Sequence, residues 1–242
     1  IFTATVALSG GTANSGNFTP TAPGVYRWTA TYNGNTNYNT VSHPCNSTNE
    51  STTVNKATPT IVTVAQPGAT AGLGIGLSDT ATVTGNATGG TPTGTVTFNL
   101  YGPNDASCSG AVAFTATIAL SGGTANSGSF TPAAVGVYRW TATYNGDANY
   151  NSVSHPCNST NETTTVNKDN PTIVTNAQPG ASTTLGNALS DTATVSGSAA
   201  GGTPTGTVTF NLYGPNDASC SGAVIFTATV ALSGGTANSG NF

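Results

Sequence analysis

The amino-acid sequence predicts an all-β protein made of consecutive β-sandwich units. No stretch of its 242 residues has the apolar spacing of a helix, whereas β-branched and aromatic residues alternate with polar residues in short runs. Clusters of Gly, Pro and Asn separate these runs, as turns do. The chain also repeats itself at a spacing close to the length of one sandwich domain, which is roughly 100 residues.

The internal repeat has a period of 112 residues. Three matched pairs show it: Trp28 and Trp140, Cys45 and Cys157, Cys108 and Cys220. The segment 1–18 recurs letter for letter as 225–242, and the copy between them, 113–130, is almost the same. A period this long exceeds that of solenoid repeats, so the repeat unit is predicted to be a domain.

Boundaries between units are expected where a proline follows a polar stretch that contains lysine. This pattern occurs at 54–59, Val-Asn-Lys-Ala-Thr-Pro, and again at 166–171, Val-Asn-Lys-Asp-Asn-Pro. We therefore predict a complete unit at 57–168, the C-terminal half of a unit at 1–56, and the N-terminal part of another at 169–242. Because both ends of the chain fall in strand-like sequence, we expect a segment of a longer array.

About seven strands are predicted in the complete unit, from alternating runs bounded by turn residues. Their ranges are 59–65, 77–84, 94–101, 112–120, 124–131, 135–144 and 159–167. In the third run, Val96, Phe98 and Leu100 fall on the same side of the strand, since side chains alternate between two faces. One buried face and one solvated face indicate a sandwich and not a parallel α/β sheet.

The core of each unit is predicted to be anchored by a tryptophan. Trp140 is the single Trp of the complete unit and lies in an alternating run, and Trp28 is its counterpart in the unit before. A ligand-stacking role is the alternative to a core role. Burying Trp140 with a handful of Val, Leu and Phe side chains, at roughly 1.5–3 kcal/mol each, gives an adequate core for such a unit.

The surface is expected to be nearly uncharged and rich in hydroxyl groups. Only 5% of the residues are charged, against roughly 25% in an average soluble domain, and the formal net charge is -4. The four basic residues form no face that could neutralise phosphates, which excludes nucleic acid as a partner. No apolar run approaches the roughly 18 residues that span a bilayer, so no membrane insertion is expected within this chain.

No catalytic, cofactor or metal site is expected, and the chain is predicted not to be an enzyme. His43 and His155 each stand two residues before a cysteine, in Ser-His-Pro-Cys. The proline favours an extended chain, and neither a third orienting group nor an oxyanion motif accompanies them. The cysteines lack the Cys-x-x-Cys spacing of zinc and redox sites, and the acidic residues are scattered along the unit.

Six Asn-x-Ser/Thr triplets are candidate N-glycosylation sites. They begin at Asn17, Asn46, Asn49, Asn86, Asn158 and Asn161. A chain rich in Asn, Ser and Thr also forms such triplets by chance, and their glycosylation depends on the host.

Two stretches, Gly94–Phe98 and Tyr138–Tyr150, resemble bacterial immunoglobulin-like repeats. The second is the more specific, because it ends in the turn Tyr-Asn-Gly-Asp-Ala-Asn-Tyr; in the unit before, Asn35 stands where this turn has Asp147. The resemblance covers the whole chain. It implies tandem immunoglobulin-like sandwiches in a large secreted or surface-attached bacterial protein, many of which are adhesins that use such repeats as stalk modules.

We therefore expect a non-catalytic extracellular module that extends a stalk, spacer or filament at a cell surface. Near-identical units with short linkers add length without adding chemistry, and their partners are the adjacent repeats of the same chain. The alternative is that the repeats themselves bind surface glycans, or that weakly charged strand edges associate laterally with like chains into a fibre.

The four cysteines are expected to be oxidised, and two pairings are open. In the first, Cys108 pairs with Cys157 inside one unit, which leaves Cys45 and Cys220 with partners outside the chain. In the second, Cys45 pairs with Cys108 and Cys157 pairs with Cys220, which joins neighbouring units. We favour the intradomain bond, because a domain with its own clasp can be duplicated without depending on the register of its neighbour.

Overall fold

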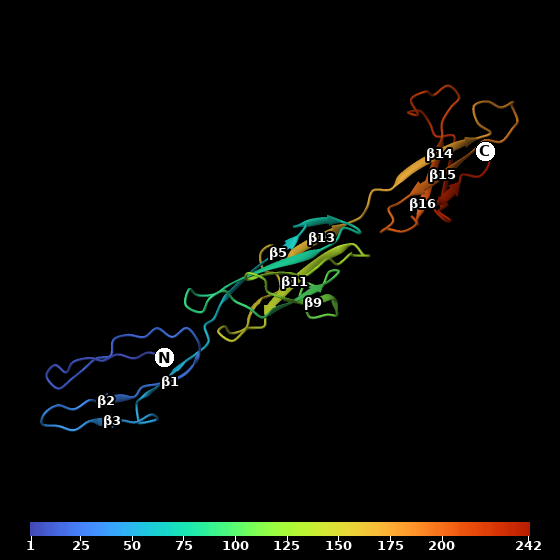
Figure 1. The fold of residues 1–242 in the computed structure, drawn as a ribbon. Helices are drawn as coiled ribbons and strands as arrows, with labels where there is room; N and C mark the ends of the chain where they lie inside the picture. Colours follow the sequence, from blue (N-terminus) through green and yellow to red (C-terminus); the bar gives the residue numbers. More distant parts are fainter.

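The structure, a computed structural model, describes all of residues 1–242 and consists of strands without a helix. The all-β prediction is therefore confirmed. The 18 strands form three groups that follow one another along a line: β1–β4, β5–β13 and β14–β18 (Figure 1). We call these groups the first, central and third parts. No helix that could cross a membrane is present.

The central part is a sandwich of two sheets. Its strands are β5 (Thr60–Gln66), β6 (Thr70–Gly72), β7 (Ser78–Thr84), β8 (Thr95–Tyr101), β9 (Val112–Ala119), β10 (Thr124–Asn126), β11 (Gly136–Tyr144), β12 (Val153–His155) and β13 (Thr163–Asn167). One sheet has the order β10–β7–β5, and the other has the order β6–β13–β11–β8–β9 with β12 also paired to β11. All pairs are antiparallel except β13 with β6.

Alternation along these strands places one face of each sheet in a shared core. In β5 and β8 every second residue is buried, and β11 has the same pattern over most of its length. The core cluster contains 16 buried residues, all of them between Ile61 and Val166. Ile61 and Val83 come from one sheet, and Phe98 and Trp140 come from the other, so the core lies between the two layers.

Five of the seven predicted strands agree closely with the structure, and the details differ in three places. The central part has nine strands, because the three-residue strands β6 and β12 are too short to show alternation in the sequence. The strand predicted at 124–131 ends at Asn126. The strand predicted at 159–167 begins only at Thr163, because a turn closed by the Glu162 N–H and the Ser159 carbonyl occupies the residues before it.

The third part repeats the pairing of the central part. Its strands are β14 (Thr172–Gln178), β15 (Ser190–Ser196), β16 (Thr207–Leu212), β17 (Phe226–Ala231) and β18 (Thr236–Asn238). The sheet β14–β15–β18 corresponds in register to β5–β7–β10, and β16–β17 corresponds to β8–β9. Its core cluster has only four buried residues, and β14 is exposed along its whole length.

The first part contains two antiparallel ribbons, and its tryptophan, Trp28, belongs to no buried core cluster. Its strands are β1 (Gly24–Arg27), β2 (Ala30–Tyr32), β3 (Val41–His43) and β4 (Ser51–Val54), with β1 paired to β4 and β2 to β3. The expectation that Trp28 is a buried anchor is wrong for this chain, since Trp28 is 38% exposed. The first part has no sheet equivalent to β10–β7–β5, which faces β11 in the central part, and Trp28 packs edge to face against Phe2.

Candidate functional site

The disulfide of the central part joins Cys108 to Cys157, with Cα atoms 6.0 Å apart. This is the intradomain pairing that the sequence analysis favoured. The loop after β8 bends toward Cys157 because the Asp105 carboxylate accepts hydrogen bonds from the N–H groups of Ser107 and Gly110. Asn158 then donates from Nδ2 to the Ala106 carbonyl and so ties the two loops together.

The other two cysteines, Cys45 and Cys220, are free and exposed. The neighbour pairing of Cys45 with Cys108 and of Cys157 with Cys220 is therefore not formed.

Trp140 on β11 is fully buried at the centre of the sandwich. Its ring meets Phe98 and Phe114 edge to face, with centroids 6.5 and 5.9 Å away. Both distances lie in the range in which aromatic pairs attract one another beyond the effect of buried area alone. Trp140 is thus enclosed by protein and has no face open to a ligand.

Asp147 organises the turn that follows β11. Its Oδ1 accepts hydrogen bonds from the N–H groups of Asn149 and Tyr150, and its Oδ2 accepts two from the N–H and hydroxyl of Thr93. Burial acts to raise the pKa of Asp147, but the hydrogen bonds outweigh it and hold the pKa at about 2. The carboxylate therefore links the β11–β12 turn to the loop before β8.

A buried cluster of four polar side chains lies between the two sheets of the sandwich. We call it the Thr63 cluster, and its members are Thr63, Asp79, His155 and Glu162. Thr63 lies in the middle of β5 and Asp79 is the second residue of β7, so both occupy inward positions of the same sheet. His155 ends β12 and Glu162 directly precedes β13, so the opposite sheet supplies the other two.

The Thr63 hydroxyl is the centre of this cluster. It donates to Glu162 Oε1 at 2.6 Å and lies 2.7 Å from His155 Nδ1. Thr63 is 2% exposed, Asp79 and Glu162 are fully buried, and the His155 side chain is 19% exposed. The site is therefore closed except on the side of the imidazole.

The two carboxyl groups share a proton more easily than they hold two charges. Burial, together with the neighbouring Asp79 charge, raises the pKa of Glu162 to about 8, and burial raises the pKa of Asp79 to about 6. Both Asp79 oxygens and Glu162 Oε2 lack a protein donor, and a proton on either carboxyl supplies one. Burial lowers the pKa of His155, which keeps the imidazole neutral.

The sequence contains a signal for this cluster in the alternation of β5 and β7. Thr63 alternates with Ile61 and Ala65 on β5, and Asp79 alternates with Ala81 and Val83 on β7. A carboxylate at a core position of an otherwise apolar pattern indicates a buried polar network. The partners of Asp79 could not be found from spacing, because the four residues lie on three strands and a turn.

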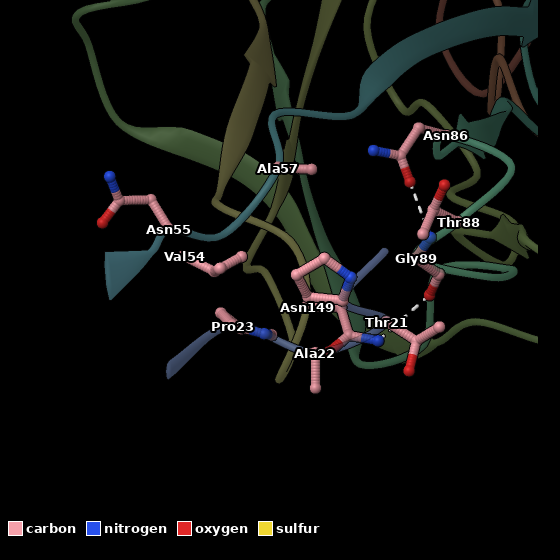
Figure 2. Close-up of a pocket in the computed structure, with 11 residues that line it drawn as sticks. Thr21, Ala22, Pro23, Val54, Asn55, Ala57, Asn86, Thr88, Gly89 and Asn149 are labelled. Carbon is pink, nitrogen blue, oxygen red and sulfur yellow. Dashed lines mark hydrogen bonds between the residues drawn. The ribbon is translucent and has the colours of Figure 1, made fainter. Parts of the chain in front are cut away.

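No group of three or more His, Cys, Asp or Glu side chains is arranged to hold a metal ion. A small pocket lies where the first part meets the central part, and it is lined by residues of both (Figure 2). Its rim includes Ala22 and Pro23 on one side and Asn86, Gly89 and Asn149 on the other, with Asn149 Nδ2 donating to the Gly89 carbonyl. None of its side chains is ionisable.

The candidate N-glycosylation sites all lie in the structure outside the strands. Four of the six, Asn46, Asn49, Asn158 and Asn161, adopt a positive φ, which Asn tolerates better than most residues. These asparagines therefore have a conformational role in their turns, and their glycosylation stays a prediction.

Comparison of the chain with models of protein families gives no match, and comparison with curated proteins gives none either.

Proposed function

We propose that this chain is a structural segment of an extracellular stalk or spacer, built from tandem immunoglobulin-like sandwiches. The observation that carries the proposal is the linear arrangement of the three parts (Figure 1). The chain enters the central part from the first part at one end and leaves toward the third part at the other. Each added unit therefore lengthens the molecule, by about 30–40 Å for strands of this length.

The connection between the first and central parts supports a stalk, because it is held by specific contacts. Lys56 donates from Nζ to the Asp147 carbonyl, and Asn151 Nδ2 donates to the Lys56 carbonyl. Ala57 forms a parallel bridge with Tyr150. The connecting segment is thus attached along the sandwich and is stiffer than a free linker.

The disulfide and the sequence repeat also suit an extracellular structural role. Disulfides persist in oxidising compartments, so the Cys108–Cys157 bond favours an extracellular location. The repeat of 112 residues in the sequence and the equal strand registers of the central and third parts support tandem units.

One observation favours a second function, lateral association with like chains. Val62 and Val64 point outward from β5 and are exposed, and Val174, the counterpart of Val62, is exposed on the corresponding strand β14. Apolar side chains repeated along the outside of successive units form a surface on which a second chain could pack.

Small-angle X-ray scattering and negative-stain imaging of the 242-residue chain test the two functions. A stalk segment gives single elongated particles whose length does not depend on protein concentration. Lateral fibres that disappear in a Val62→Thr/Val64→Thr variant would replace the stalk proposal by the association proposal. Compact particles with the three parts folded onto one another would contradict both.

A further inference from the structure

The Thr63 cluster brings an alcohol, a base and a neutral carboxylic acid together inside a closed site. We propose that the Thr63 hydroxyl and the Glu162 carboxyl condense to an ester, which joins β5 to the segment before β13 by a covalent bond. The protein's own side chains perform the reaction, and no cofactor is required. The proposal goes beyond the stalk function and does not depend on it.

The nucleophile and its base are already in contact. The Thr63 hydroxyl donates to Glu162 Oε1, and rotation about its C–O bond turns the same proton toward His155 Nδ1. His155 Nδ1 lies 2.7 Å from the Thr63 oxygen, a distance suited to proton transfer. Burial keeps His155 neutral, so the nitrogen is able to accept the hydroxyl proton. A threonine hydroxyl is a weak nucleophile until such a base is adjacent.

The electrophile is a carboxyl group that the fold holds in its neutral form. A carboxylate resists attack because of its charge, whereas a carboxylic acid has a hydroxyl that can leave. Burial and the adjacent Asp79 favour the protonated form of Glu162, whose Oε1 lies 2.6 Å from the Thr63 oxygen. The charge of the adjacent Asp79 keeps this proton on Glu162, because two neighbouring buried carboxyls hold one proton between them more easily than two charges.

Atoms and protons balance without an external reactant. The Thr63 oxygen forms a bond to the Glu162 carboxyl carbon, and its proton moves to His155 Nδ1. His155 passes this proton to Oε1, which stands 3.9 Å from its Nδ1. The bond between the carbon and Oε1 then breaks, and the proton of Oε2 moves by way of Asp79 to the leaving hydroxide, which becomes water. The products are one ester and one water molecule, and Asp79 and His155 return to their starting forms.

Enclosure favours the ester over its hydrolysis. Reacting groups held in contact have effective concentrations of about 10⁵–10⁸ M, well above that of water. The released water can leave past the imidazole, which is the only partly exposed group of the cluster. The buried Thr63 and Glu162 atoms then have little contact with solvent.

The position of the bond gives it a mechanical consequence. Thr63 lies on the first strand of the central part, Glu162 lies just before the last strand, and 99 residues separate them. A pulling force that enters at β5 would pass through the ester to β13, and the intervening strands and the Cys108–Cys157 loop would not be stretched.

Digestion of the intact 242-residue chain with trypsin provides the test. Cleavage after Lys56, Arg139 and Lys168 places Thr63 in fragment 57–139 and Glu162 in fragment 140–168. The disulfide also joins these fragments, so the protein is first denatured, reduced and alkylated. We expect the fragments to remain joined, with a mass about 18 Da below their sum, and to separate in hydroxylamine.

Matched variants decide which atoms form the bond. Thr63→Val keeps the shape of the side chain without its hydroxyl and should give two separate fragments, whereas Thr63→Ser should keep them joined. Glu162→Gln should lose ammonia in place of water, which changes the mass loss to about 17 Da. Near-ultraviolet circular dichroism shows for each variant that the sandwich is folded.

The chain contains its own control. In the first part, His43 and Glu50 face each other at 3.8 Å, but no residues correspond to Thr63 and Asp79. The third part has Thr175 and Asp191 without a histidine and glutamate. We therefore expect one lost water per chain; fully separable fragments in the folded wild-type protein, or a bond that persists in Thr63→Val, would overturn the proposal.

Discussion

Cys108 and Cys157 are joined across a loop of 49 residues that contains β9, β10, β11 and β12. The disulfide therefore encloses strands of both sheets and the core residue Trp140. A bond in this place restricts the unfolded chain strongly, because loop-closure entropy rises with loop length. It also limits how far the central part can extend under tension.

Replacing both cysteines, Cys108→Ala/Cys157→Ala, should lower the free energy of unfolding of the central part by about 2–4 kcal/mol. Urea denaturation followed by tryptophan fluorescence measures the change. The matched control is Cys45→Ala/Cys220→Ala, which should leave the midpoint unchanged because these cysteines are exposed and free. Equal effects of the two double variants would contradict a structural role for the disulfide.

The two tryptophans should respond differently to truncation. Trp140→Ala removes a fully buried side chain and should cost about 3–5 kcal/mol, whereas Trp28→Ala should cost about 1 kcal/mol or less because Trp28 is partly exposed. Thermal unfolding by circular dichroism gives both values. A small effect of Trp140→Ala would mean that the core does not depend on the ring contacts with Phe98 and Phe114.

Alternation in the sequence was sufficient to predict the larger strands and the buried side of each. Val96, Phe98 and Leu100 are buried as their spacing predicts, and Trp140 lies opposite Leu100 in the register of β11 with β8. Strands of three residues were missed because so short a segment has no period. Burial of Trp28 was predicted from its equivalence to Trp140, but burial depends on neighbouring strands as well as on the residue.

The polar interactions were harder to predict, because they join residues far apart in sequence. Asp147 was recognised as a turn residue, yet its bonds to Thr93 bridge two loops that sequence alone does not place together. The same limit applied to the Thr63 cluster. The pairing of Cys108 with Cys157 was predictable only as one of two alternatives, since the loop that brings Cys108 to its partner depends on hydrogen bonds to Asp105.

Substitutions of Asp147 should separate its turn role from its bridging role. Asp147→Asn keeps an oxygen for the N–H groups of Asn149 and Tyr150, as Asn35 does for Asn37 and Tyr38 in the first part, and should cost about 1 kcal/mol.

Asp147→Ala loses all four hydrogen bonds and should cost about 2–3 kcal/mol. Chemical denaturation at pH 7 compares the two variants. If the Asn and Ala variants are equally destabilised, the two bonds to Thr93 account for the whole effect. The bonds to the N–H groups of Asn149 and Tyr150 would then contribute nothing to stability. The Asp147 pKa lies below its ordinary value, so its contribution is present above pH 4 and should be lost as the pH falls toward 2.

The stability of the sandwich should fall in mild alkali when Thr63 carries no hydroxyl. Thr63→Val is the suitable background, because Glu162 then stays a free carboxyl. The pKa of Glu162, about 8, and that of Asp79, about 6, both exceed their ordinary values of 4.5 and 3.8. A raised pKa means that the folded state binds the proton more tightly, so its stabilisation is complete below the ordinary value and is lost as the pH rises through the folded-state value. His155 acts in the opposite sense, since its pKa is lowered and its contribution is present above pH 6.5.

From pH 6.5 upward, therefore, ionisation of the buried carboxyls should control the change, and the melting temperature of Thr63→Val should drop by about 5 °C between pH 6.5 and pH 9. Thr63→Val/Glu162→Gln is the matched control, because its amide cannot ionise and should leave a smaller drop. Differential scanning calorimetry across this range measures both proteins. A melting temperature that stays constant or rises in Thr63→Val would show that both carboxyls are ionised in the folded protein at neutral pH. That result would contradict the shared proton. It would also contradict the neutral Glu162 on which ester formation depends.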